Sequence, residues 1–436
     1  MPVSTHSPSL IAQYRAPIGG GLILIFVLIA LAGEINHQLP QFTGLLALIA
    51  IMILPTRLSP ALLWQCGVMM AIGLGLLIWM SLVGADIPWY EPLNSNIPLL
   101  ILFSAVSFLR VLPIAPAEAE HQNNGLKGYI QTFLGTHALS AVINMSAAVV
   151  VADYLKKGDK PEHTLTTMVM RAVCVAAYWS PFFAAMATVL HYLPELSLSE
   201  LWIYSIPLTL LGLALTIWEA RALSPNHLQT FKGYPISAES LLLPMSLLAS
   251  VFVARLIWPD VAMVLLVSIA SLVIPCVLLL KRQGPRNALT SVRQHIAHKL
   301  GNLRGEFLLF ISAGILGSGG SALFIQYPPL LPFETFTATV ACVLLLILIG
   351  TALLGAHVLV GISISAPVVL STDPSITLLG LCYLSAWSIA SIVSPFSGLA
   401  LMFRGHYQLS LQEILSAHWQ YGIAMTIASM LMFYMV

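Results

Sequence analysis

The chain has 436 residues, of which 58% are hydrophobic and only 8% are charged, and its formal net charge is +1. Soluble domains carry about 25% charged residues, so this composition excludes an ordinary soluble protein. The nearly balanced charge gives no reason to expect nucleic acid as a partner.

Apolar stretches of about 20 residues, each long enough to cross a bilayer, recur from end to end. The first follows Arg15 and covers residues 17–33. It is longer than the apolar region of about 7–15 residues in a signal peptide, so we expect a retained span. The expected spans cover residues 17–33, 40–55, 61–84, 97–115, 162–192, 199–219, 238–257, 260–280, 305–325, 375–403 and 415–435.

Two further apolar regions, residues 126–155 and 333–371, do not fit as single spans, and we expect each to be a re-entrant hairpin. With a cytoplasmic N-terminus, this topology puts 16 of the 18 Lys and Arg residues on the cytoplasmic side, as the positive-inside rule requires. Only Arg171 and Arg255 are exceptions. If either region crossed once, every later loop would change sides. The sequence therefore predicts an all-α polytopic membrane protein with about 11 transmembrane helices, two re-entrant hairpins and an outer C-terminus.

The two halves of the chain resemble each other in five short segments, in the same order and offset by 208 to 220 residues. Because the expected topology runs the two copies in opposite directions, it predicts inverted repeats, which are typical of secondary transporters. We divide the chain into a tail with the first helix (1–34) and two repeats (35–220 and 221–436). The matching pairs are 102–105 with 310–313, 134–139 with 354–359, 146–150 with 365–369, 180–182 with 394–396, and 196–201 with 409–414.

Each hairpin is followed by a span that contains Ser-Pro-Phe. Proline removes a backbone donor and clashes with the preceding turn, so we expect helix breaks at Pro181 and Pro395. Irregular backbone in a membrane is tolerated where it lines a cavity. The breaks therefore predict a binding site, although an ordinary proline kink is the alternative at either position alone.

Polar side chains at the same depth are the candidate ligands of a solute. Small hydroxyls in membrane helices usually bond the i−4 carbonyl, and the histidines can be structural, proton carriers or ligands. The amide of Asn144 needs partners in an apolar surrounding. The candidates are Thr136, His137, Ser140, Asn144, Ser146 and Ser180 in the first repeat, and His357, Ser363, Ser365, Ser394 and Ser397 in the second.

Arg171 completes the set of candidate ligands, because a charge deep in a span is a functional hypothesis by default. The alternative is that it snorkels to the cytoplasmic interface. The acidic residues Asp153, Glu219 and Glu306 all fall near cytoplasmic ends, which disfavours a pump built on buried carboxylates. Helix N-termini, hydroxyls, one amide and one arginine suit an anion, and sodium could still bind freed carbonyls and hydroxyls.

This layout resembles the ion transporter superfamily, which includes divalent anion/sodium symporters, arsenite efflux permeases and membrane subunits of tripartite periplasmic transporters. The resemblance implies an elevator mechanism, a homodimeric scaffold and a bacterial inner (plasma) membrane. The sequence departs from the Ser-Asn-Thr hairpin tips of the divalent anion symporters. Its nearest equivalents, Ser140, Asn144 and Ser146, are spread apart, and Ser363 and Ser365 have no asparagine beside them.

We therefore expect a secondary active transporter of a small anionic solute, coupled to sodium or protons. A metalloid or inorganic ion efflux permease is the alternative within transport. A membrane-embedded polysaccharide enzyme is less favoured, because the longest outer loop, residues 85–96, is short. A purely structural membrane subunit is disfavoured by the paired hairpins. We expect no catalytic residues, no metal site, and no cofactor beyond a sodium ion as a candidate coupling ion.

Overall fold

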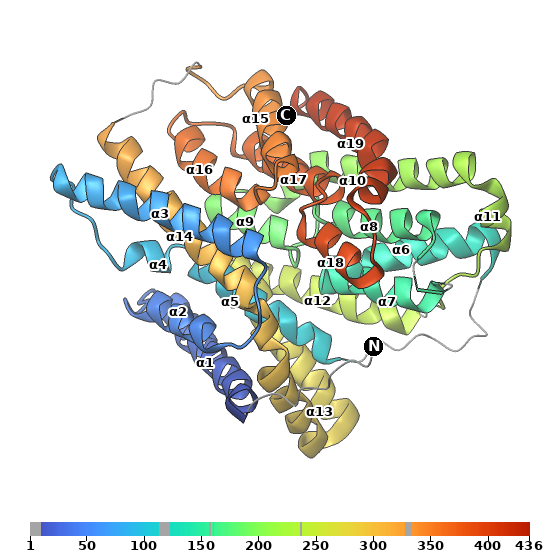
Figure 1. Ribbon diagram of the computed structural model, residues 1–436, viewed down its shortest axis with the longest axis horizontal. Coiled ribbons are helices and arrows are strands. Elements are labelled where there is room, and N and C mark those ends of the chain that lie inside the picture. The colour runs from blue at the N-terminus through green and yellow to red at the C-terminus, as the bar shows by residue number, and fades with distance from the viewer. Residues whose placement is uncertain (1–9, 113–122, 157, 160, 236–237, 328–332) are drawn as a thin grey trace, which may run out of the picture. The chain divides into compact units, whose positions relative to one another are not determined.

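A computed structural model describes residues 10–112, 123–156, 158–159, 161–235, 238–327 and 333–436 (Figure 1). The end of the expected span 97–115 and two of the cytoplasmic basic residues, Lys157 and Lys160, lie outside this part. The described residues form helices and no strands. Six helical segments among them are long and apolar enough to cross a membrane. The prediction of an all-α polytopic membrane protein is therefore confirmed.

The contacts between residues divide the chain into two compact units, each built from both halves of the sequence. Unit 1 contains residues 1–112 and 265–329, and unit 2 contains residues 113–264 and 330–436. The two expected repeats divide the chain differently, because each of them contributes to both units.

Unit 1 is held together by a close crossing of two long helices, α3 and α14. A Cβ on Gly73 would lie 2.6 Å from the carbonyl oxygen of Ile315, and one on Gly319 would lie 2.5 Å from that of Gly73. Glycine thus lets the two backbones approach each other directly. The elements of unit 1 are α1 (Leu10–Ile35), α2 (Thr43–Ile53), α3 (Pro60–Leu82), α4 (Glu91–Asn94), α5 (Ile97–Ser107), η1 (Phe108–Val111), nearly all of α13 (Met263–His298), η3 (Leu300–Leu303) and α14 (Arg304–Gln326).

The long helix α13 extends well past the expected span at 260–280. Gly284, with φ 76°, interrupts its helical backbone, and Pro285 follows. The segment beyond the kink is a helical arm that carries Arg286 and Arg293, where the sequence predicted a loop.

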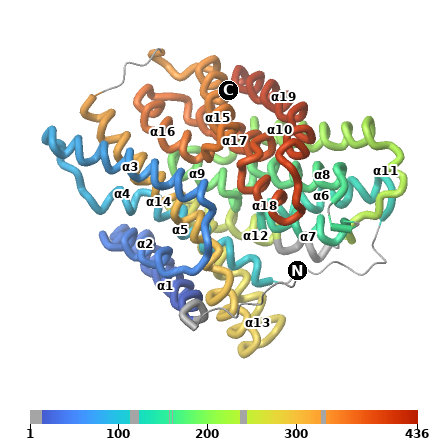
Figure 2. Tube along the Cα trace, viewed as in Figure 1, coloured from blue at the N-terminus to red at the C-terminus, as the bar shows by residue number. Residues whose placement is uncertain are grey.

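Unit 2 surrounds two central helices, α8 and α17, whose side chains are nearly all buried. Helix α17 packs against α15, α19, α9, α8 and α10, and Figure 2 shows the course of these segments. The elements of unit 2 are α6 (Gly125–Ile143), α7 (Met145–Leu155), α8 (His163–Ala176), α9 (Ala184–Tyr192), α10 (Leu198–Leu223), α11 (Pro225–Thr230), α12 (Ala238–Ile257), α15 (Ala338–Leu353), α16 (Val358–Leu370), α17 (Ile376–Val393), α18 (Gly398–Tyr407) and α19 (Leu411–Phe433).

Both expected hairpin regions form pairs of contacting helices in unit 2, α6 with α7 and α15 with α16. The first hairpin has a very tight turn. Helix α6 continues to Ile143, and Asn144 alone, with φ 54° and ψ −139°, separates it from α7. The second hairpin turns over residues 354–357.

Candidate functional site

Both Ser-Pro-Phe segments interrupt their helices. The first lies between α8, which ends at Ala176, and α9, which begins at Ala184. The second lies between α17, which ends at Val393, and α18, which begins at Gly398. Both breaks belong to unit 2, as do both hairpins.

The serine of each break makes the same pair of hydrogen bonds. The hydroxyl of Ser180 donates to the carbonyl of Ala141 in α6 and accepts the N–H of Phe182 at 3.2 Å. The hydroxyl of Ser394 donates to the carbonyl of Ala352 in α15, at 2.6 Å, and accepts the N–H of Phe396 at 3.2 Å. Each serine therefore fastens its break to the preceding hairpin and satisfies an amide that the missing helical turn would leave unpaired.

The tip of the first hairpin lies against the first break through Asn144. Its amide nitrogen donates weakly to the carbonyl of Phe182, at 3.4 Å. That contact fixes which way the amide group faces, because turning it over would put two acceptors together. The buried Oδ1 of Asn144 and the buried hydroxyl of Ser140 have no hydrogen-bond partner among the described residues. The tip thus offers acceptor oxygens.

Several candidate hydroxyls are satisfied within the protein. Thr136 bonds the carbonyl of Thr132, and Ser363 bonds that of Val360, both on their own helix. Ser365 contacts the hydroxyl of Tyr383 at 3.0 Å. No hydrogen bond of the Ser146 side chain occurs within the described part of the chain.

The second break borders a small cavity of about 30 Å³. Three predicted residues, His357, Ser394 and Ser397, come together around it. The Ser397 hydroxyl also caps α18 by accepting the N–H of Ala400 at 3.1 Å. Sequence reasoning missed two further lining residues, Trp387 and Ser391, because both lie inside an apolar helical stretch with no local signal.

Arg171 forms its hydrogen bonds with residues outside the hairpin tips. Its guanidinium makes two hydrogen bonds with the carboxylate of Glu219, at 2.8 and 3.0 Å, and a third with the carbonyl of Ala417 at 2.8 Å. The side chain is 1% exposed and stacks on Tyr421, 4.3 Å from the ring centre. The carboxylate that sequence reasoning set aside as peripheral thus neutralises this buried charge.

The same junction of α8, α10 and α19 holds other buried polar groups. Both ring nitrogens of His418, the hydroxyl of Tyr421 and the Nε of Arg171 have no hydrogen-bond partner among the described residues. Neither His418 nor Tyr421 was a candidate, because the sequence does not show that α19 packs against α8.

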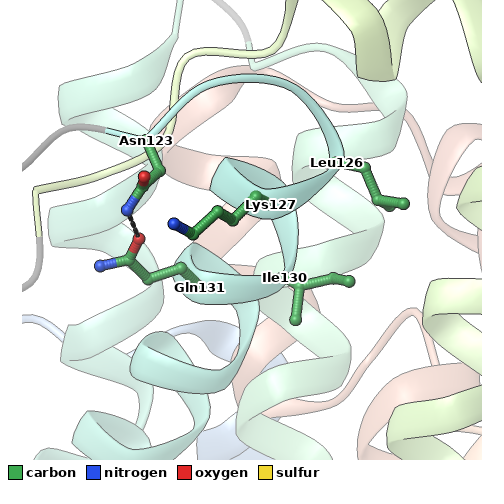
Figure 3. A pocket seen from close by; sticks show the side chains of 5 residues that line it. All are labelled: Asn123, Leu126, Lys127, Ile130 and Gln131. Atoms are coloured by element: carbon green, nitrogen blue, oxygen red, sulfur yellow. Dashed lines mark hydrogen bonds between the residues drawn. The ribbon is translucent and has the colours of Figure 1, made fainter.

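A larger, open pocket of about 520 Å³ lies at the start of α6. Figure 3 shows the amine of Lys127 on the same side as the paired amides of Asn123 and Gln131, whereas Leu126 and Ile130 project to the other side. None of the predicted site residues lines it, so the candidate site remains at the hairpin tips and breaks.

No protein-family model matches the chain. No curated protein matches it significantly in sequence either. Among solved structures, the YdaH transporter of Alcanivorax borkumensis is similar with a TM-score of 0.48 and 14% identity, over 85% of this chain and 98% of that one. MtrF of Neisseria gonorrhoeae, described in connection with a class of antimetabolite efflux pumps, is similar with a TM-score of 0.45 and 12% identity, over 89% and 97%.

Neither description names the ion transporter superfamily, so that resemblance stays a prediction. Both solved structures have low sequence identity to this chain and TM-scores below 0.5. The chain is an all-α polytopic membrane protein. Its function has to follow from its own residues.

Proposed function

We propose that the protein is a secondary active transporter of a small anionic solute, and that it works in the bacterial inner membrane. The observation that carries this proposal is the repeated geometry of unit 2. Each half of the chain contributes a helical hairpin and a helix broken at Ser-Pro-Phe, and the serine bonds the hairpin in the same way in both. Broken helices that meet at repeat-related positions are the usual design of a transport site.

The chemistry of the site supports an anion. The break in the second half places the N-terminus of α18, the positive end of its dipole, beside the cavity. No acidic side chain of the described residues lines that cavity. Sodium as the coupling ion is supported by the oxygens of Asn144 and Ser140, which have no hydrogen-bond partner among the described residues. Protons are the alternative coupling ion.

An elevator-type motion would move unit 2, which carries both hairpins and both broken helices, against unit 1. The expected homodimer belongs to the same proposal. The alternative is a metalloid or inorganic ion efflux permease, which the small cavity volume of about 30 Å³ supports.

The test is transport by purified protein in proteoliposomes. Succinate, benzoate, methanesulfonate and arsenite would first be screened for stabilisation of the purified protein, with and without sodium. Each stabilising probe would then be followed across the vesicle membrane under an imposed sodium or proton gradient. We expect at least one anion to accumulate against its own gradient. If folded protein moves none of them under either gradient, the transporter proposal is wrong.

A further inference from the structure

The two repeat-related histidines, His137 and His357, differ in what the protein already provides for their rings. Trp179 donates its indole N–H to Nε2 of His137 at 3.0 Å, and the carbonyl of Ala172 lies 2.9 Å from Nδ1. Because an indole only donates and a carbonyl only accepts, the ring is neutral with its proton on Nδ1. Both nitrogens are therefore used inside the protein.

His357 has only one nitrogen in use. Its Nδ1 accepts the backbone N–H of Leu359 at 3.1 Å and so caps the N-terminus of α16. An acceptor nitrogen carries no proton, so the neutral ring has its proton on Nε2. No described residue accepts a hydrogen bond from that N–H. The ring contacts Trp387 edge-on, with 5.3 Å between centroids, which holds its orientation.

The ring of His357 lines the small cavity at the second break. A volume of about 30 Å³ has room for about two water-sized atoms, which is the size of the two oxygens of one carboxylate. None of the described residues that line it is charged, so an anionic group there would be held by neutral donors. The rest of a larger solute would lie outside this space.

The N-terminus of α18 supplies further donors at the cavity. Ser397 accepts the N–H of Ala400 with its hydroxyl and that of Leu401 with its carbonyl. The amides of Gly398 and Leu399 have no such partner in the described structure, and Gly398 lines the cavity. The donors of a helix N-terminus and of a histidine thus meet at one small space.

We propose that this cavity binds the carboxylate end of a monoanionic solute, with the Nε2–H of His357 as a donor. His137, its repeat counterpart, makes no contact with the solute. The inference rests on the proposed transport function and specifies the end of the site that takes the negative charge.

Two matched variants separate binding from folding. His357→Ser keeps an N-cap acceptor for α16 but removes the imidazole donor. His137→Gln disturbs the hydrogen bond between His137 and Trp179 in the first half, so it reports what a general loss of stability does. Benzoate and benzamide serve as probes, because they share one ring and differ in the charged group.

Binding would be measured on the purified full-length protein in lipid nanodiscs, together with thermal unfolding. We expect the wild type to bind benzoate more tightly than benzamide. His357→Ser should lose at least about tenfold in benzoate affinity with little change in melting temperature. His137→Gln should lower the melting temperature and leave the affinity for benzoate unchanged.

Three results would overturn the inference. These are absence of benzoate binding by the wild type, an unchanged affinity in folded His357→Ser, and an equal loss of affinity in both variants. Proteoliposome transport distinguishes this failure from that of the proposed function. Binding that depends on His357 without any flux would remove the transporter alone, whereas flux that is unaffected in His357→Ser would remove this inference alone.

Discussion

At the scale of single residues, Ser180 and Ser394 occupy matching positions in the sequence and form matching hydrogen bonds in the structure. Each hydroxyl joins a hairpin carbonyl to an amide of the break. The candidate hydroxyls of Thr136 and Ser363 instead bond carbonyls of their own helices, which is the ordinary behaviour of such residues. Buried hydroxyls in unit 2 thus have two roles: some join separate elements, and others bond only within their own helix.

We predict that Ser180→Ala and Ser394→Ala each destabilise the protein by about 1–3 kcal/mol, because each removes the hydrogen bond that joins a break to its hairpin and the bond that satisfies a backbone amide of the break. Ser363→Ala is the matched control, since its hydroxyl is equally buried but bonds only within α16. Thermal unfolding in detergent or nanodiscs measures the differences. Equal effects of all three changes would show that the breaks are not held by these serines.

The pair of Arg171 and Glu219 is the other feature at this scale. We predict that Glu219→Gln destabilises the fold by about 3 kcal/mol, because it leaves the buried charge of Arg171 uncompensated. Arg171→Gln should cost less, because the carboxylate that it leaves unpaired is 19% exposed. The double replacement Arg171→Met with Glu219→Met should recover much of the loss. Thermal unfolding of Arg171→Met, Glu219→Met and the double variant completes a double-mutant cycle and gives the coupling. Additive losses would mean that the ion pair contributes nothing, and Arg171 would again be a candidate ligand of the solute.

At the scale of elements, most helices follow the apolar stretches, because each long stretch must satisfy its own backbone in a membrane. Helix α13 is the exception, since it continues beyond its apolar stretch. The breaks were foreseeable from proline chemistry. The single-residue turn at Asn144 was not, since φ 54° for a non-glycine residue is set by the packing of both arms. The partners of Arg171 were not foreseeable either, because Glu219 and Ala417 lie 48 and 246 residues away in sequence.

The turn at Asn144 gives a prediction of its own. A side chain at this φ and ψ carries strain that glycine does not, so Asn144→Gly should be about 1 kcal/mol more stable than Asn144→Ala. Thermal unfolding compares the two variants directly. If the amide oxygen binds the solute or the coupling ion, Asn144→Gly should still lose transport. Equal stabilities would show that the turn is not strained.

At the scale of the whole molecule, sorting of basic residues in the sequence predicts which ends of the helices face the cytoplasm. We predict that a single cysteine at Asp86 reacts with a membrane-impermeant maleimide on intact cells, and that one at Arg286 reacts only after permeabilisation. Both positions are exposed in the structure. The five native cysteines would be replaced first. External labelling at Arg286 would reverse the topology and the side from which each hairpin enters.

The one-residue turn between α6 and α7 also limits how this chain can change in length. Each added residue rotates the following helix by about 100°. Because only Asn144 separates the two helices, no loop can accommodate an insertion there. Rotation of α7 would move Asp153 away from the hydroxyl of Tyr407, which donates to its carboxylate at 3.2 Å. The second hairpin, with four residues between its helices, can take up such a change in its loop. Insertions ahead of His357, in residues 354–356, should therefore cost less stability than insertions beside Asn144.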